Sequence, residues 1–322
     1  MGPDPSKAQR SDISVPDILF RYAREKESAL KKSGTLFAHY TSAYAAMQIL
    51  KGRQLWLRNA ALMNDYLEVQ YGRASLIEAL RLHGERFCTV FLQSHPGVVE
   101  RALGVLDERD FFNNHQTYLS SLCEHDPTND LGLLSMWRAY GGATAGVALI
   151  FKPDFLDLDT SPLRVWSSPV LYGREAFVDE FEKLTELAEK NTEVFNDLSS
   201  EDLEIFLYNS LQSAILSCKH EGFAEEREWR LIHSPSEGLS PFVPCTVEAV
   251  RDRAEIVHHL PIDKSDELPG LRLTDLLDRV IIGPCEHPIQ MAMAFQQLLA
   301  DIGFDDPDKY IRISNIPLRQ RG

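Results

Sequence analysis

The sequence lacks a Cys-x-x-Cys pair, a long apolar run and a surplus of basic residues. Its five cysteines are odd in number and show no disulfide pattern, which favours a reducing, cytoplasmic location. No apolar run approaches the roughly 20 residues of a membrane-spanning helix, and the start shows no signal-peptide pattern, so we expect no membrane association. The formal net charge of −15 argues against non-specific nucleic-acid binding, which needs a basic surface.

The chain also lacks the short motifs of several enzyme classes. The glycines of "SMWRAYGGATAG" have neither the Lys-Ser/Thr of a phosphate-binding P-loop nor the G-x-G-x-x-G spacing of a dinucleotide fold. No G-x-S-x-G nucleophile elbow occurs, and no histidines and cysteines have zinc spacing. We therefore expect no bound metal and no Rossmann-type cofactor.

Apolar periodicity predicts an α+β protein in which strands and helices alternate without a regular βαβ repeat. Residues 1–14 are polar and contain proline, which predicts a flexible tail. Residues 15–322 are expected to form a single mixed domain. It would begin with a helix at 15–32 and carry a helical insertion at about 174–220. The predicted strands include 36–38, 54–57, 117–125, 145–151, 227–233, 278–282 and 310–316.

The stretch "LFAHYTS" places four polar residues at the end of a predicted strand, directly before a helix. Side chains at such a strand end can reach a cleft, where His39, Tyr40, Thr41 and Ser42 could bind a ribose or a phosphate. The structural alternative is that Thr41 or Ser42 caps the helix and His39 is a satisfied, partly buried histidine.

Two further segments carry candidate binding residues. "RNAALMNDYLE" crowds Arg58, Asn64 and Asp65 into a loop that opens a helix, and a helix N-cap accounts for only one of them. In "MWRAY", Trp137 and Tyr140 share a helix face, so they could stack on a flat heterocycle or belong to the core.

The stretch "FAEEREWRLIH" is the strongest source of carboxylates. On a strand, Glu226, Glu228 and Arg230 would project to one face. Burying two carboxylates and a guanidinium in a core costs free energy unless the charges are paired, so unpaired ones would indicate a functional role. A solvated edge strand is the alternative.

Quoted in order, the segments "HYTS", "LWLRNAALMNDYLE", "SLCE", "MWRAYGG", "GVALIF", "VLYG", "EEREWRL", "RVIIGP" and "IRISNIPLR" resemble a bacterial family known only as domain of unknown function 2971. The resemblance covers residues 35 to 319. It implies membership of that family and supplies no activity.

A more distant resemblance does imply an activity. His-x-Thr-Ser at a strand end, then a helix, a short strand and much later a glutamate-bearing strand, is similar to the ADP-ribosyltransferase superfamily, His-Tyr-Glu branch. The resemblance implies a mixed, split β-sheet flanked by helices, with NAD bound as substrate in the split. His39 would orient a ribose, and Glu228, or alternatively Glu226, would stabilise the oxocarbenium ion. Tyr140, Trp137 and Tyr172 compete for the aromatic position against the nicotinamide.

These implied roles are chemically coherent. Cleavage of the nicotinamide–ribose bond develops positive charge at the anomeric carbon, which a fixed carboxylate stabilises most in the transition state. Glu226 could activate an acceptor, and Arg58 or Arg230 could hold the diphosphate.

The leading hypothesis is therefore an NAD-consuming, ADP-ribosyltransferase-like enzyme. Its acceptor would be a protein, a nucleic acid or water, and a toxin or phage-defence effector would fit the superfamily. A non-enzymatic module that binds a nucleotide or a protein is the main alternative. A phosphotransferase using the same cleft is a third hypothesis, although only Arg53 and Arg58 lie near His39 in the sequence.

Overall fold

The computed structural model describes residues 13–62, 66–109, 115–140, 145–250, 253–264 and 272–317. Two compact units make up the chain. We call the described parts of 1–26, 67–111 and 171–222 the helical unit, and those of 27–66, 112–170 and 223–322 the sheet unit. Most of the predicted N-terminal tail, residues 1–12, lies outside the described residues.

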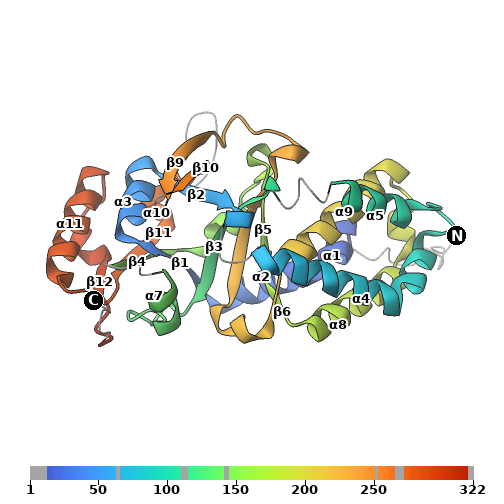
Figure 1. Ribbon diagram of the computed structural model, residues 1–322, viewed down its shortest axis with the longest axis horizontal. Helices are drawn as coiled ribbons and strands as arrows, with labels where there is room; N and C mark the ends of the chain where they lie inside the picture. Colours follow the sequence, from blue (N-terminus) through green and yellow to red (C-terminus); the bar gives the residue numbers. More distant parts are fainter. Residues whose placement is uncertain are drawn as a thin grey trace, which may run out of the picture. The chain divides into compact units, whose positions relative to one another are not determined.

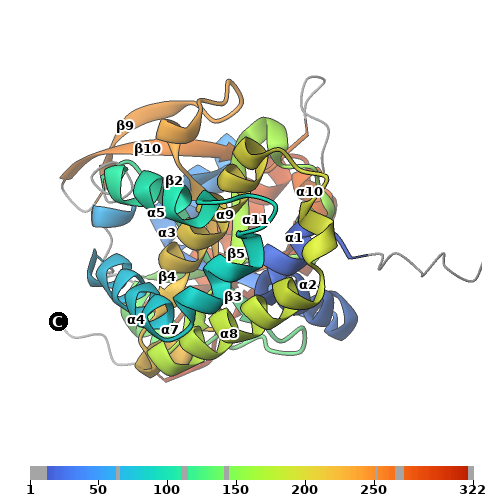
Figure 2. The same ribbon diagram turned by 90° about the vertical axis from the view of Figure 1, so that its right-hand side faces the viewer.

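The helical unit packs amphipathic helices around an aromatic core. Phe87 and Phe181 have ring centroids 5.0 Å apart, as do Phe91 and Phe195. Ser199 caps the helix that begins at Ser200, because its hydroxyl accepts a hydrogen bond from the Asp202 N–H at 3.0 Å. Helix α5 lies along α9 (Figure 2). The elements are α1 (Val15–Leu19), the start of α2 (Arg21–Ser33), α4 (Tyr66–Phe91), α5 (Val98–Glu108), α8 (Arg174–Lys190), α9 (Ser200–Leu216) and the parallel pair β6 (Leu171–Tyr172) and β7 (Cys218–Lys219).

The sheet unit contains one large mixed sheet, which confirms the α+β class (Figure 1). Its main strand order is β12-β11-β4-β1-β3-β2-β10-β9, and β8 pairs with both β3 and β5. Only β11 and β12 are parallel among the described pairs of this sheet. The strands are β1 (Leu36–Ser42), β2 (Gln54–Asn59), β3 (Tyr118–His125), β4 (Gly146–Phe151), β5 (Val165–Pro169), β8 (Glu228–His233), β9 (Cys245–Val250), β10 (Arg253–Pro261), β11 (Leu277–Ile282) and β12 (Ile311–Ile313).

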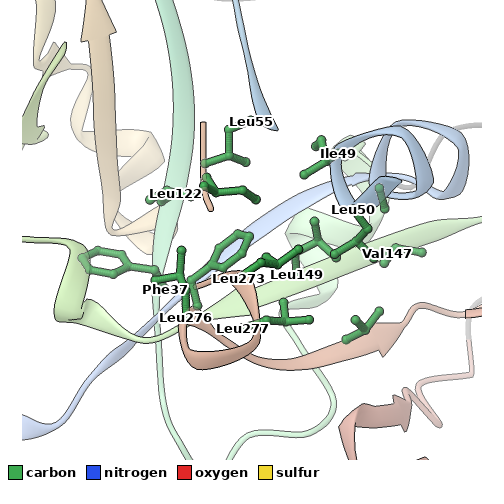
Figure 3. Close-up of a cluster of buried hydrophobic side chains, with 14 of the residues drawn as sticks. Phe37, Ile49, Leu50, Leu55, Leu122, Val147, Leu149, Leu273, Leu276 and Leu277 are labelled. Carbon is green, nitrogen blue, oxygen red and sulfur yellow. The ribbon is translucent and has the colours of Figure 1, made fainter. Parts of the chain in front are cut away.

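Helices cover both faces of the sheet near β4. On one face, α3 (Ala43–Gly52), α10 (Leu273–Leu276) and α11 (Pro288–Asp301) contribute to a core that includes Leu50, Leu149 and Leu277 (Figure 3). On the other, α7 (Leu134–Tyr140) supplies Met136 and Trp137 to a smaller cluster with Ala148 and Ile150. Burial on both faces explains why β4 reads as a continuous apolar run.

Helix α3 ends at Gly52, and Arg53 follows it in the left-handed conformation with φ 52°. One local prediction is corrected in the sheet unit. The strand expected from residue 227 begins at Glu228, because the 3₁₀ helix η5 (Glu221–Glu226) and a left-handed Arg227 precede it. The hairpin of β9 and β10 was not predicted at all. None of the helices in the described ranges is both long and apolar enough to span a bilayer.

Candidate functional site

The sheet opens along β3. Strand β8 pairs with residues 118–123 of β3 on one edge. The other edge of β3 pairs with β1 through residues 123–125 and with β2 through residues 118–119. In the described pairing, residues 120–122 have no strand partner on that edge, so β1 and β2 separate beside them.

A cavity of about 250 Å³ lies at this opening. A buried water needs only about 10–15 Å³, so the space suits a ligand. The walls come from strands β1, β2, β3 and β9 and from helices α3 and α7. The lining residues are His39, Tyr40, Thr41, Ser42, Tyr44, Ala45, Ile49, Trp56, Arg58, Leu119, Ser120, Ser121, Cys123, Met136, Tyr140, Ala249 and Val250.

His39 is held as a neutral imidazole. Its Nδ1 lies 3.0 Å from the Ser121 carbonyl oxygen, which can only accept, so Nδ1 carries the proton and donates. Burial lowers the pKa of His39, and the hydrogen bond to Ser121 opposes this shift. The remaining nitrogen, Nε2, is then an acceptor that can receive a hydrogen bond from a ligand hydroxyl.

Ser121 also connects the cavity wall to Glu228. The Ser121 hydroxyl donates to Glu228 Oε1 at 2.5 Å, while Arg230 donates to the same carboxylate from Nε at 3.0 Å and from Nη2 at 3.2 Å. Glu228 is 3% exposed and Arg230 is 2% exposed. Neither lines the cavity, so the carboxylate lies one side chain behind its wall.

Arg58 lines the cavity, but its guanidinium group already forms an ion pair with a carboxylate. Its Nε and Nη2 donate to the two carboxylate oxygens of Glu255, each at 3.0 Å. Glu255 is 3% exposed, and a buried carboxylate that loses its cation is strongly destabilised. A diphosphate would have to share Arg58 with Glu255, which weakens the role expected for this arginine.

The residues of the HYTS motif divide between structural and binding roles. Ser42 caps α3, because its Oγ accepts from the Ala45 N–H at 3.2 Å. The Tyr40 hydroxyl accepts from the Leu133 N–H at 3.0 Å, and burial raises the pKa of Tyr40. Thr41 lines the cavity with them. Ser42 therefore caps a helix, as the structural alternative predicted, and it also lines the cavity.

The two aromatic candidates of α7 lie in different surroundings. Tyr140 lines the cavity. Trp137 is 3% exposed, donates from Nε1 to the Leu131 carbonyl at 2.9 Å and packs edge-on against Tyr40 with centroids 4.9 Å apart. Its ring belongs to the core and does not line the cavity. Sequence reasoning missed two other rings of the wall, Trp56 from β2 and Tyr44 from α3.

The expected common strand face of Glu226, Glu228 and Arg230 does not form as predicted. Glu226 ends η5, two residues before β8 begins, and only Glu228 and Arg230 share the strand. Asn64 and Asp65 lie outside the described residues. Within the described ranges, no group of three or more His, Cys, Asp or Glu side chains could hold a metal ion.

Comparison with protein families gives a match to part of the chain. Residues 136–231 match the family described as "Protein of unknown function (DUF2971)". Comparison with curated proteins and with solved structures found no match. The family match begins at Met136 in α7, covers β4 and β5 and continues to Leu231 in β8, so it includes Tyr140 and Glu228. It supplies no activity, and nothing in these comparisons links the chain to ADP-ribosyltransferases.

Proposed function

We propose that the cavity beside β3 binds NAD and that the protein cleaves its nicotinamide–ribose bond, in the manner of an ADP-ribosyltransferase. The observation that supports this most is the convergence on Ser121. His39 donates to its carbonyl oxygen, and its hydroxyl donates to Glu228. An imidazole from β1 and a carboxylate from β8 therefore meet at one residue of a cavity wall.

The proposed roles follow from the protonation states. Nε2 of neutral His39 accepts a hydrogen bond from a ribose hydroxyl and orients the sugar. The rings of Tyr140 and Trp56 offer faces for the nicotinamide or the adenine. Glu228 acts on the ribose when the Ser121 hydroxyl turns away, and its negative charge then stabilises the oxocarbenium ion. Arg230 remains paired with Glu228 and holds this carboxylate in place.

The test is the release of free nicotinamide from NAD, with water, a protein extract or an oligonucleotide as acceptor. We expect Glu228→Gln to reduce release at least 100-fold while NAD affinity changes less than threefold, because the carboxylate acts mainly in the transition state. His39→Gln should weaken NAD binding about tenfold through loss of the Nε2 contact. The matched controls Glu286→Gln and His287→Gln replace exposed residues of the same unit and should leave both quantities unchanged.

A second candidate function is favoured by the burial of Glu228. Its carboxylate is enclosed by Ser121 and Arg230, which suits a nucleotide-binding module that performs no chemistry. Such a module would bind NAD, measured by calorimetry, and release no nicotinamide with any of the three acceptors. NAD that neither binds nor turns over would contradict both functions.

A further inference from the structure

Strand β9 is an outer strand of the large sheet, and it lacks the usual protection of a sheet edge. In the part of the chain that the structure describes, β9 pairs with β10 alone and ends the strand order (Figure 2). Four of its six side chains are exposed, and Val247 is 71% exposed. Natural edge strands are shielded by a bulge, a proline or a lysine, or they are very short. β9 has none of these features over six residues, whereas β12, at the other end of the strand order, has only three residues.

One hydrogen bond fixes the direction of every backbone group on β9. The His259 N–H donates to the Pro244 carbonyl oxygen at 2.8 Å, so the backbone of residue 244 points toward β10. Backbone groups alternate in direction along a strand that pairs without a register shift, so the even-numbered residues up to 250 also point toward β10. Cys245, Val247 and Ala249 therefore direct their N–H and C=O groups outward, away from β10.

These outward groups suit an antiparallel pairing of β9 with β9 of a second copy. In an antiparallel ladder, opposite residues whose backbone groups face each other exchange two hydrogen bonds. A two-fold axis at Val247 sets Val247 opposite itself and Cys245 opposite Ala249, so all three outward pairs of groups find partners. The same register sets Glu248 of one copy opposite Thr246 of the other. An axis one residue later would instead set two Glu248 carboxylates opposite each other, which is destabilising.

One face of the hairpin formed by β9 and β10 is apolar and exposed. Val247 pairs with Ile256 and Ala249 pairs with Ala254, so these four side chains share a face of the sheet, and all four are exposed. About an axis at Val247, the Val247 side chains of the two copies contact each other, and each Cys245 contacts an Ala249. The edge is therefore complementary to itself in hydrogen bonding, in charge and in apolar contact.

We propose that β9 is a dimerisation edge, at which a second copy of this chain continues the sheet antiparallel about a two-fold axis at Val247. Each copy contributes the same edge, so association stops at the dimer. One strand per copy makes an interface below the standard size, and we expect a dissociation constant of about 10–100 μM. Two chains of net charge −15 repel each other, so this constant should fall as salt is added. The proposal does not rest on the proposed NAD chemistry.

Sedimentation velocity of the full chain, at low and at high salt, measures the dissociation constant. Val247→Pro removes the outward N–H at the axis and leaves the bonds to β10 intact, and an edge strand tolerates proline at such a position. We expect it to weaken dimerisation at least tenfold, because two hydrogen bonds are lost. Val247→Lys keeps the N–H and sets two ammonium groups opposite each other, so it should act in the same way if proline disturbs the fold. Ile256→Thr, on the same face but in β10, is the matched control and should leave the constant unchanged.

Cross-linking tests the register. Opposite residues of a hydrogen-bonded antiparallel pair have Cα atoms about 5.5 Å apart, which is within the range of a disulfide. In a Cys245→Ser background, Val247→Cys should oxidise to a covalent dimer, while Ile256→Cys, one strand further from the axis, should not. A wild-type chain that stays monomeric at millimolar concentration, a dissociation constant that rises with salt, or equal cross-linking of the two variants would overturn the proposal. The first of these results would assign the edge to an extended segment of a different protein.

Discussion

Acid should destabilise the sheet unit through a buried pair of histidines. His233 and His258 have ring centroids 4.9 Å apart, and the His258 ring lies 4.2 Å from that of Tyr118. His233 Nδ1 lies 2.8 Å from the Arg164 carbonyl oxygen and donates to it, and His258 hydrogen-bonds the backbone of Val243. The other nitrogens, His233 Nε2 and His258 Nδ1, are buried without a partner among the described residues.

The direction and size of the effect follow from the pKa of His258. Burial lowers it to about 4, with further lowering by His233 and His259 and a smaller opposing effect of the Val243 hydrogen bond. As pH falls, the unfolded chain, with a histidine pKa of about 6.5, binds the proton first. The contribution to stability is therefore complete above pH 6.5 and is lost between pH 6.5 and 4. At pH 5 the loss is about 2 kcal/mol, and relaxation around the charged ring reduces the expected value to about 1–2 kcal/mol.

Urea unfolding followed by tryptophan fluorescence measures this loss in the correct unit. All four tryptophans, Trp56, Trp137, Trp166 and Trp229, belong to the sheet unit. His258→Phe keeps a ring against Tyr118 but cannot titrate, so its loss of stability between pH 8 and pH 5 should be about 1–2 kcal/mol smaller than that of the wild type.

Comparison of the variants removes the contribution of carboxylates that titrate in the same range. His287→Gln, whose histidine side chain is 71% exposed, should behave as the wild type. Equal losses in the wild type and in His258→Phe would refute the reasoning.

Two other changes test the core around the site. Arg230→Met leaves the buried Glu228 carboxylate without its cation and should cost about 3–5 kcal/mol in the free energy of urea unfolding. Combining it with Glu228→Gln should recover part of that loss, and purely additive effects would argue against the pair. Gly283→Ala would place a Cβ 2.8 Å from the Trp137 ring and 2.9 Å from the Gly146 carbonyl oxygen, so thermal unfolding should show a loss of about 1–3 kcal/mol. Gly52→Ala, whose Cβ would meet only Gln54 at 3.8 Å, should change stability by less than about 1 kcal/mol in the same measurement.

The sequence predicts most of the sheet because burial leaves local patterns. The apolar run of β4 and the strand–turn–helix at His39 follow from periodicity and capping, which depend on neighbours along the chain. The pairing of Arg58 with Glu255 depends instead on the register of β2 with β10, 197 residues apart in sequence. No local pattern indicates that partner, so Arg58 looked available for a phosphate.

The position of Glu228 could not be predicted for the same reason. Its burial depends on the register between β3 and β8, which sets Cys123 opposite Glu228 and Ser121 opposite Arg230. The strand pattern correctly predicts that Glu228 and Arg230 lie on the same face of the strand. It does not predict which neighbouring residue covers the Glu228 carboxylate. Trp56 was missed because the residues that complete its surroundings lie on distant strands.

Strand β3 is the sole described strand that pairs with both β1 and β2. A modest change in backbone twist at residues 120–122 can therefore alter the distance between these two strands without breaking either set of ladder hydrogen bonds. The spacing between β1 and β2 beside residues 120–122 can therefore change at a low cost in free energy, and the same fold can accommodate ligands of different sizes. Amide hydrogens of residues 120–122 that point away from β8 should exchange with solvent faster than those that point toward it, and a bound molecule should slow them.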